Sequence, residues 1–189
     1  VKKLGCDSLS LSGHKIYAPK GIGALYLKSG VRIKPMMLGG GQQNALRSGT
    51  EPVPLIYGMG RAVEALDSTI DERLEHVGKV NSYARDALAQ VGAVILSKPE
   101  ASPYILSVAV PGLKSETVLH YLESAQIYVS SGSACSKGKK SGVLAEFKVS
   151  DKYIDSVIRL SFSYENTKED IDLLAAKLKE GMESLAKIK

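Results

Sequence analysis

Short apolar runs alternate with amphipathic helical segments along most of this 189-residue chain. The runs 105–110 and 157–162 have the length and composition of strands. The segments 115–124 and 167–187 repeat apolar residues at helical spacing. Strands and helices that alternate in this way bury their apolar faces by packing in layers, so the pattern predicts an α/β fold.

A change of composition divides the chain. Prolines at 52 and 54 introduce a helix over about 55–67, and a longer amphipathic helix is expected over about 69–91. Upstream the sequence is rich in glycine, whereas downstream it has the helical and strand patterns described above. We therefore expect one domain over 1–54 and a second, small α/β domain over 55–189.

The expected first domain is basic as well as glycine-rich. Its run 23–27 has the composition of a buried strand, and residues 39–50 form a long stretch with little periodicity, which is typical of functional loops. Residues 1–60 hold eight Lys and Arg against two Asp and Glu. This excess favours an anionic partner such as phosphate, although ordinary surface lysines give the same count. No nucleic-acid-binding motif accompanies it, so we do not expect nucleic acid.

The apolar runs are only a few residues long, whereas a membrane-spanning helix needs about 20. No basic-then-apolar leader opens the chain, so we expect neither membrane insertion nor secretion. Two cysteines, Cys6 and Cys135, are too few for a disulfide framework. They predict a reducing compartment such as the cytoplasm.

Lys15 is the first candidate for chemistry. It lies in a mostly apolar segment whose other polar residues, including Ser12 and His14, carry small hydroxyls and an imidazole. A lysine that is desolvated near other cations can form a Schiff base with a carbonyl cofactor. Ser12 and His14 could donate hydrogen bonds to a phosphate. The alternative is a solvated surface lysine, which is the commonest state of this residue type.

Cys135 is the second candidate. A short strand is expected over 127–129, followed by a loop of small and basic residues over 130–142 that contains this cysteine. Three lysines follow Cys135 within five residues and would favour the thiolate, which is the nucleophilic form. A small buried hydrophobe is the ordinary alternative for a free cysteine. Cys6 has no such surroundings and is expected to be structural.

Arg159 is the third candidate, because it is the only charge inside the strand run 157–162. An arginine in an apolar run needs a partner, which could be a substrate carboxylate held in bidentate fashion or an internal acidic residue. No cluster of histidines, cysteines and acidic residues has the spacing of a metal site, so no metal is expected.

Four motifs occur in order along the chain: SGHKIYAPKGIGALY at 12–26, GGGQQ at 39–43, RSGTE at 47–51 and SSGSACS at 130–136. With them the sequence closely resembles the NifS/IscS-type cysteine desulfurases, pyridoxal-phosphate enzymes of the aminotransferase class V fold. The resemblance implies the C-terminal half of a fold-type I enzyme. That half comprises the final strands of the large cofactor domain and a small α/β domain.

The resemblance also implies roles for residues near the cofactor, pyridoxal 5'-phosphate. Lys15 corresponds to the lysine that holds the cofactor covalently, and Ser12 and His14 correspond to residues that contact its phosphate. Thr50 corresponds to a threonine that reaches the phosphate of the neighbouring subunit's cofactor. The resemblance therefore implies a homodimer.

For the substrate, the resemblance implies L-cysteine, whose carboxylate Arg159 would bind. Cys135 would accept the sulfur as a persulfide while alanine is released, and the sulfur would then pass to an acceptor protein. An iron–sulfur scaffold, a tRNA-thiolation protein and another carrier all remain open as the acceptor.

The sequence also departs from the family pattern. Residues 162–167 stand where many relatives carry a Gly-Arg pair, and the chain opens at Val1 without the family's N-terminal half. That half supplies further cofactor contacts, so we expect a piece of a longer enzyme that is inactive alone. The alternatives are a selenocysteine lyase, a class V aminotransferase, or a non-catalytic module that carries persulfide or binds a partner.

Overall fold

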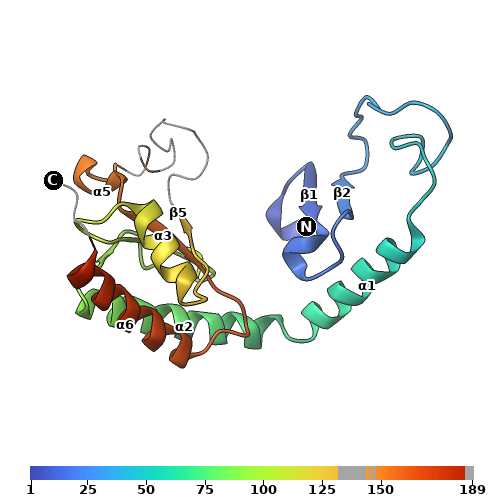
Figure 1. Cartoon of the computed structure of the whole chain (residues 1–189). Helices are drawn as coiled ribbons and strands as arrows, with labels where there is room; N and C mark the ends of the chain where they lie inside the picture. The colour runs from blue at the N-terminus through green and yellow to red at the C-terminus, as the bar shows by residue number, and fades with distance from the viewer. Residues whose placement is uncertain (132–143, 145, 147, 186–189) are drawn as a thin grey trace. The chain divides into compact units, whose positions relative to one another are not determined.

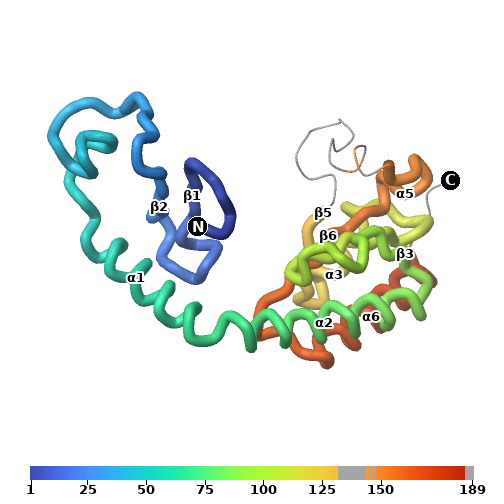
Figure 2. Tube along the Cα trace, turned by 180° about the vertical axis from the view of Figure 1, so that it is seen from behind, coloured from blue at the N-terminus to red at the C-terminus, as the bar shows by residue number. Residues whose placement is uncertain are grey.

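The computed structural model describes residues 1–131, 144, 146 and 148–185 (Figures 1 and 2). Its elements fall into two units, Val1–Ile70 and Asp71–Lys189. The sequence predicted a division after residue 54. The two boundaries differ because the helix predicted over about 55–67, which was expected to begin the second domain, lies in the first unit. Whether the domains of the whole protein divide after residue 54 stays a prediction.

The first unit is built on an antiparallel pair of strands, β1 (Ser8–Ser12) and β2 (Gly23–Leu27). A short 3-10 helix, η2 (Gly13–Ile16), follows β1, and another, η1 (Lys2–Leu4), precedes it. Helix α1 (Val53–Asp67) contacts the segment after η2, because its Gly58 leaves room for the ring of Pro19. A Cβ at Gly58 would lie 2.9 Å from that ring.

The strand predicted over 23–27 forms with those bounds, but the prediction that it is buried is wrong. Leu25 is 53% exposed, and Ala24 and Tyr26 are exposed as well. The physical reason is that β2 pairs only with β1 among the described residues, so neither face of this two-stranded sheet is fully covered.

The second unit contains a four-stranded sheet in the order β3-β4-β6-β5, with every neighbouring pair antiparallel. Its strands are β3 (Val94–Ile95), β4 (Ile105–Ala109), β5 (Ser130–Ser131) and β6 (Val157–Ser161). Its helices are α2 (Ile70–Gln90), α3 (Ser115–Ser124), α5 (Asp151–Ile154) and α6 (Lys168–Ser184). The described elements therefore confirm a mixed α/β fold with helices α2 and α6 side by side (Figures 1 and 2).

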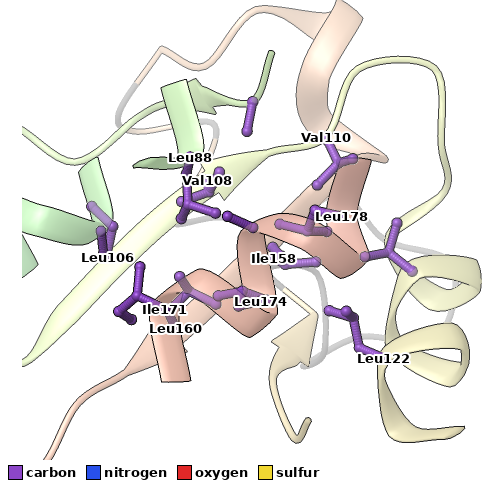
Figure 3. Close-up of a cluster of buried hydrophobic side chains, with 14 of the residues drawn as sticks. Leu88, Leu106, Val108, Val110, Leu122, Ile158, Leu160, Ile171, Leu174 and Leu178 are labelled. Atoms are coloured by element: carbon purple, nitrogen blue, oxygen red, sulfur yellow. The ribbon is translucent and has the colours of Figure 1, made fainter. Parts of the chain in front are cut away.

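One face of this sheet makes the main core. Alternate residues of β4 and β6, such as Leu106 and Ile158, are fully buried against side chains of α2, α3 and α6 (Figure 3). In a strand, successive side chains point to opposite faces, so Ser107 and Arg159 lie on the other face. There a smaller apolar cluster around Val157 covers one end of the sheet and leaves Arg159 exposed.

The strand expected over 127–129 is wrong by three residues, since the pairing occurs at Ser130–Ser131. Ile127 and Val129 pack against the main core, while Tyr128 is 77% exposed. Their alternation therefore reflects packing of an extended segment and not strand pairing. Among the described residues, no helix is long and apolar enough to cross a bilayer.

Candidate functional site

Lys15 is presented by a tight turn at the end of β1. Ser12 is the last residue of that strand, and His14 and Lys15 lie in the 3-10 helix η2. The turn closes through Gly13, whose N–H donates to the carbonyl of Ile22 at 2.9 Å. A Cβ at Gly13 would lie 2.9 Å from the same carbonyl oxygen, so only glycine permits this close approach.

Ser12, His14 and Lys15 lie within four residues of one another at this turn. All three residues are exposed, and none of their side chains forms a hydrogen bond or an ion pair with another described residue. Of the two alternatives for Lys15, the described first unit shows the solvated one, because nothing within that unit covers the turn; desolvation of Lys15 in the whole protein stays a prediction.

This set of donors suits pyridoxal phosphate. A primary amine without a carboxylate partner can condense with an aldehyde, and the hydroxyl and imidazole beside it can donate hydrogen bonds to a phosphate. The turn is held by backbone bonds and not by these side chains, so their polar atoms remain available to a ligand. The residues present therefore fit the cofactor that the motifs imply.

Thr50 lies elsewhere in the first unit, in the wall of a cavity of about 760 Å³. The cavity lies between β2, the segment 43–52 and α1, and its lining does not include Ser12, His14 or Lys15. Within the described unit, Thr50 is thus not grouped with the other three residues.

The segment before Thr50 has an unusual backbone. Gln43, Asn44 and Ala45 have φ values of 50°, 56° and 59°, which is the left-handed region. Three consecutive residues with side chains in this region cost about 1–2 kcal/mol each. Hydrogen bonds offset the cost, including Gln43 Nε2 to Glu51 Oε1 at 2.6 Å. The sequence predicts a loop here but not this turn, for which the only local signal is Asn44, a residue type tolerant of the left-handed region.

Arg159 lies at the centre of the second unit's sheet, between Ser107 of β4 and Ser130 of β5 in the strand register. Its side chain is exposed, and its Nη2 donates a hydrogen bond to Ser130 Oγ at 3.3 Å. No described acidic residue forms an ion pair with it, so the internal salt bridge considered from the sequence is not found within the described chain. Ser130 was missed because the sequence placed it in a loop.

Strand β5 is also anchored through its second residue. The hydroxyl of Ser131 lies 3.0 Å from that of Ser115, which is 3% exposed at the start of α3. The N–H of Ser115 donates to the carbonyl of Asp155 at 2.7 Å.

Cys135, the predicted nucleophile, lies outside the described residues. The described part of the chain contains no group of three His, Cys, Asp or Glu that could hold a metal ion.

The chain is similar to known proteins in both sequence and structure. The family model described as aminotransferase class-V matches residues 1–174. A cysteine desulfurase IscS from Dictyoglomus turgidum is 35% identical over 100% of this chain and 49% of its own length. A cysteine desulfurase from Gluconacetobacter diazotrophicus is 40% identical over 88% of this chain and 43% of its own length.

Among solved structures, a NifS-like protein superposes with a TM-score of 0.89 at 35% identity, over 98% of this chain and 48% of its own length. The chain thus spans about half the length of the curated relatives it matches.

Proposed function

The chain belongs to the aminotransferase class-V family, and from this premise we propose that the whole protein is a pyridoxal 5'-phosphate-dependent cysteine desulfurase. The proposed reaction converts L-cysteine to L-alanine and leaves the sulfur on the enzyme as a persulfide, for iron–sulfur cluster or thio-cofactor synthesis. The observation that carries the proposal is Lys15, an exposed amine without a described partner, held beside Ser12 and His14. The desulfurase names of relatives at 35% and 40% identity support it.

In this proposal, the cofactor is held by residues of the first unit. Lys15 binds it covalently through its amine, and Ser12 and His14 donate hydrogen bonds to its phosphate. Thr50 contacts the phosphate of the cofactor in a second subunit. When bound, pyridoxal phosphate supplies a ring that withdraws electrons and stabilises negative charge at the substrate Cα.

Three side chains act on the substrate itself. Once the substrate's amine has taken its place on the cofactor, the Nζ of Lys15 would be free to move the proton to and from the substrate Cα, because a neutral amine can serve as a general base. Arg159 binds the substrate carboxylate through its planar fork of N–H donors. The thiolate of Cys135 attacks the substrate sulfur, so that a new S–S bond forms as the Cβ–S bond of the substrate breaks. The electron pair of the broken bond stays with the carbon fragment, which is protonated and leaves as L-alanine, and Cys135 keeps the sulfur as a persulfide. Three lysines that follow Cys135 in sequence favour the charged form of its thiol.

We also propose a homodimer and a sulfur-acceptor protein as partners, and a reducing compartment such as the cytoplasm. Large apolar side chains are exposed on the first unit, including Met36 at 97%, Leu38 at 83% and Tyr57 at 69%. Large apolar side chains with this degree of exposure are typical of surfaces that other polypeptide covers. This observation supports association without identifying the second chain.

The test is covalent labelling. The chain is incubated with pyridoxal phosphate, reduced with borohydride and digested, and the labelled lysine is identified by mass spectrometry. We expect a visible absorbance band and a label on Lys15, both lost in Lys15→Ala. Lys20→Ala, which removes another exposed lysine of the same unit, should leave both unchanged. A label spread evenly over the lysines, or none at Lys15, would contradict the cofactor assignment.

The role of Cys135 is tested in the whole protein. We expect Cys135→Ala to abolish sulfide release from L-cysteine while leaving the cofactor absorbance in place. Cys6→Ala serves as the matched control, because the half-buried Cys6 has no role in the proposal. Retained sulfide release in Cys135→Ala would remove this cysteine from the reaction.

A further inference from the structure

We propose that Ser130 is a second substrate-binding residue, and that its hydroxyl and the guanidinium of Arg159 together recognise the carboxylate of an α-amino acid. The inference rests on the proposed function, since it takes the carboxylate of the substrate as the ligand of Arg159. It adds a role for Ser130, the first residue of the motif at 130–136, to which the resemblance assigned none.

Most hydrogen-bond donors of the Arg159 guanidinium have no partner among the described residues. A guanidinium carries five N–H donors, and only the bond from Nη2 to Ser130 connects this one to a described side chain. Arg159 is exposed on the sheet face that the main core does not cover. Its remaining donors have no acceptor within the described part of the chain, and their planar arrangement matches the two oxygens of a carboxylate.

The hydroxyl of Ser130 lies beside the guanidinium of Arg159 and can still donate a hydrogen bond. Ser130 lies directly opposite Arg159 in the β5–β6 register, so the two side chains stand on the same face of the sheet. In the bond between them, the Oγ of Ser130 is the acceptor, which leaves its own O–H proton to donate. A carboxylate that lies over Arg159 would therefore meet an O–H donor beside the N–H donors.

The same hydrogen bond restricts the guanidinium. Arginine loses much rotamer freedom when it binds a ligand, and a bond already present in the free protein reduces that loss. Ser130 thus contributes in two ways, by a direct hydrogen bond to the carboxylate and by orienting Arg159. One guanidinium and one neutral hydroxyl provide a single positive charge, which suits a single carboxylate.

Ser107 provides a matched control for Ser130, because it is the other serine that lies directly opposite Arg159 in the sheet. It lies opposite Arg159 on the other neighbouring strand, β4, and therefore on the same face. It forms no hydrogen bond with Arg159, and its backbone N–H is bonded to Ser97 Oγ at 2.8 Å. A generic effect of removing a serine hydroxyl next to Arg159 would appear at both positions, whereas carboxylate binding as proposed requires only Ser130.

The experiment titrates the full chain, labelled with nitrogen-15, with L-alanine, the proposed product. The side-chain Nε–H resonance of Arg159 is assigned from its loss in Arg159→Lys and followed by NMR. We expect it to shift with L-alanine and not with ethylamine, which lacks the carboxylate. Ser130→Ala should weaken L-alanine binding about tenfold, as expected for one lost hydrogen bond to a charged group. Ser130→Thr, which keeps the hydroxyl, and Ser107→Ala should bind as the parent does.

The proposal is overturned if L-alanine does not shift the Arg159 resonance, if Ser130→Ala binds as tightly as the parent chain, or if Ser107→Ala loses as much affinity as Ser130→Ala. Backbone amide spectra of each variant show whether the sheet is intact. The Lys15 labelling experiment fails or succeeds independently, because the titration contains no pyridoxal phosphate. A chain that binds L-alanine through Arg159 and Ser130 but takes no label at Lys15 would refute the cofactor assignment and leave the carboxylate pair standing.

Discussion

Replacing Asn81 by leucine tests whether a polar clamp holds the second unit together. Asn81 lies in α2 and is only 5% exposed. Its Nδ2 donates to the carbonyl of Pro103 at 2.8 Å, and its Oδ1 accepts from Nε of Arg85 at 2.8 Å. Arg85 in turn donates to the carbonyls of Ser97 at 2.7 Å and Lys98 at 2.9 Å. The clamp therefore ties α2 to the segment between β3 and β4.

The expected loss in the free energy of unfolding is about 2–3 kcal/mol. Leucine has a similar size but leaves the Pro103 carbonyl and the Arg85 Nε without their partners, at roughly 1–3 kcal/mol each. Burial of the added apolar surface returns about 1–2 kcal/mol. Arg85→Met is milder, about 1–2 kcal/mol, because Arg85 is only half-buried and water can reach the carbonyls it leaves.

The assay is urea denaturation followed by far-UV circular dichroism, with hydrogen exchange of the β4 amides to report on the second unit separately. Asn81→Leu and Arg85→Met remove the same bond between the two side chains. The double variant should therefore lose less than the sum of the single losses. Lys79→Met removes an exposed cation of the same helix and should leave the midpoint unchanged.

Two results would refute this reasoning. One is an Asn81→Leu variant within about 0.5 kcal/mol of the parent, which is the range of ordinary surface substitutions. The other is strict additivity in the double variant, because it would mean that Asn81 and Arg85 act independently.

Three other perturbations follow from the structure. Gly23→Ala places a Cβ 2.6 Å from the carbonyl oxygen of Leu11, so β1 and β2 must shift apart, and faster hydrogen exchange of the β1 amides should show it. Unchanged exchange would contradict that contact. Thr167→Val removes the oxygen of the capping box at the start of α6 and should cost about 1 kcal/mol in urea denaturation, whereas Thr167→Ser should not. A hydrogen bond to Asp172 raises the pKa of Tyr83, so its contribution to stability is complete below the ordinary value of about 10 and is lost as pH rises through the folded value. Tyr83→Phe should lessen the alkaline fall in stability, and an identical pH profile for both proteins would argue against this.

The elements that could be predicted from the sequence are those specified by neighbouring residues. The helix over 115–124 and the strand over 23–27 form at the predicted bounds, because periodicity and flanking residues are local signals. The capping box at Thr167 is local in the same sense, since both of its hydrogen bonds join residues three apart. The family could also be predicted from the sequence, because four motifs in order are typical of it, and the match over residues 1–174 confirms the prediction.

The roles of Lys15, Thr50, Cys135 and Arg159 remain predictions. The sequence supplied the residue types and spacing of all four. The structure added the exposure of Lys15, Thr50 and Arg159, which it describes, and the hydrogen-bond partner of Arg159. Lys15 proved exposed, which no local pattern indicates, since exposure depends on what other segments cover.

Tertiary structure alone decided which residues lie opposite one another. The position of β5 depends on its pairing with β6, and that pairing makes Ser130, and not the apolar run before it, the neighbour of Arg159. The Asn81 clamp likewise joins residues that share no sequence motif. Helical periodicity and caps arise from contacts within a few residues and can be read along the chain. Strand register, burial and the partner of a buried polar group arise from contacts between segments far apart in sequence, so they are set only when the chain is folded.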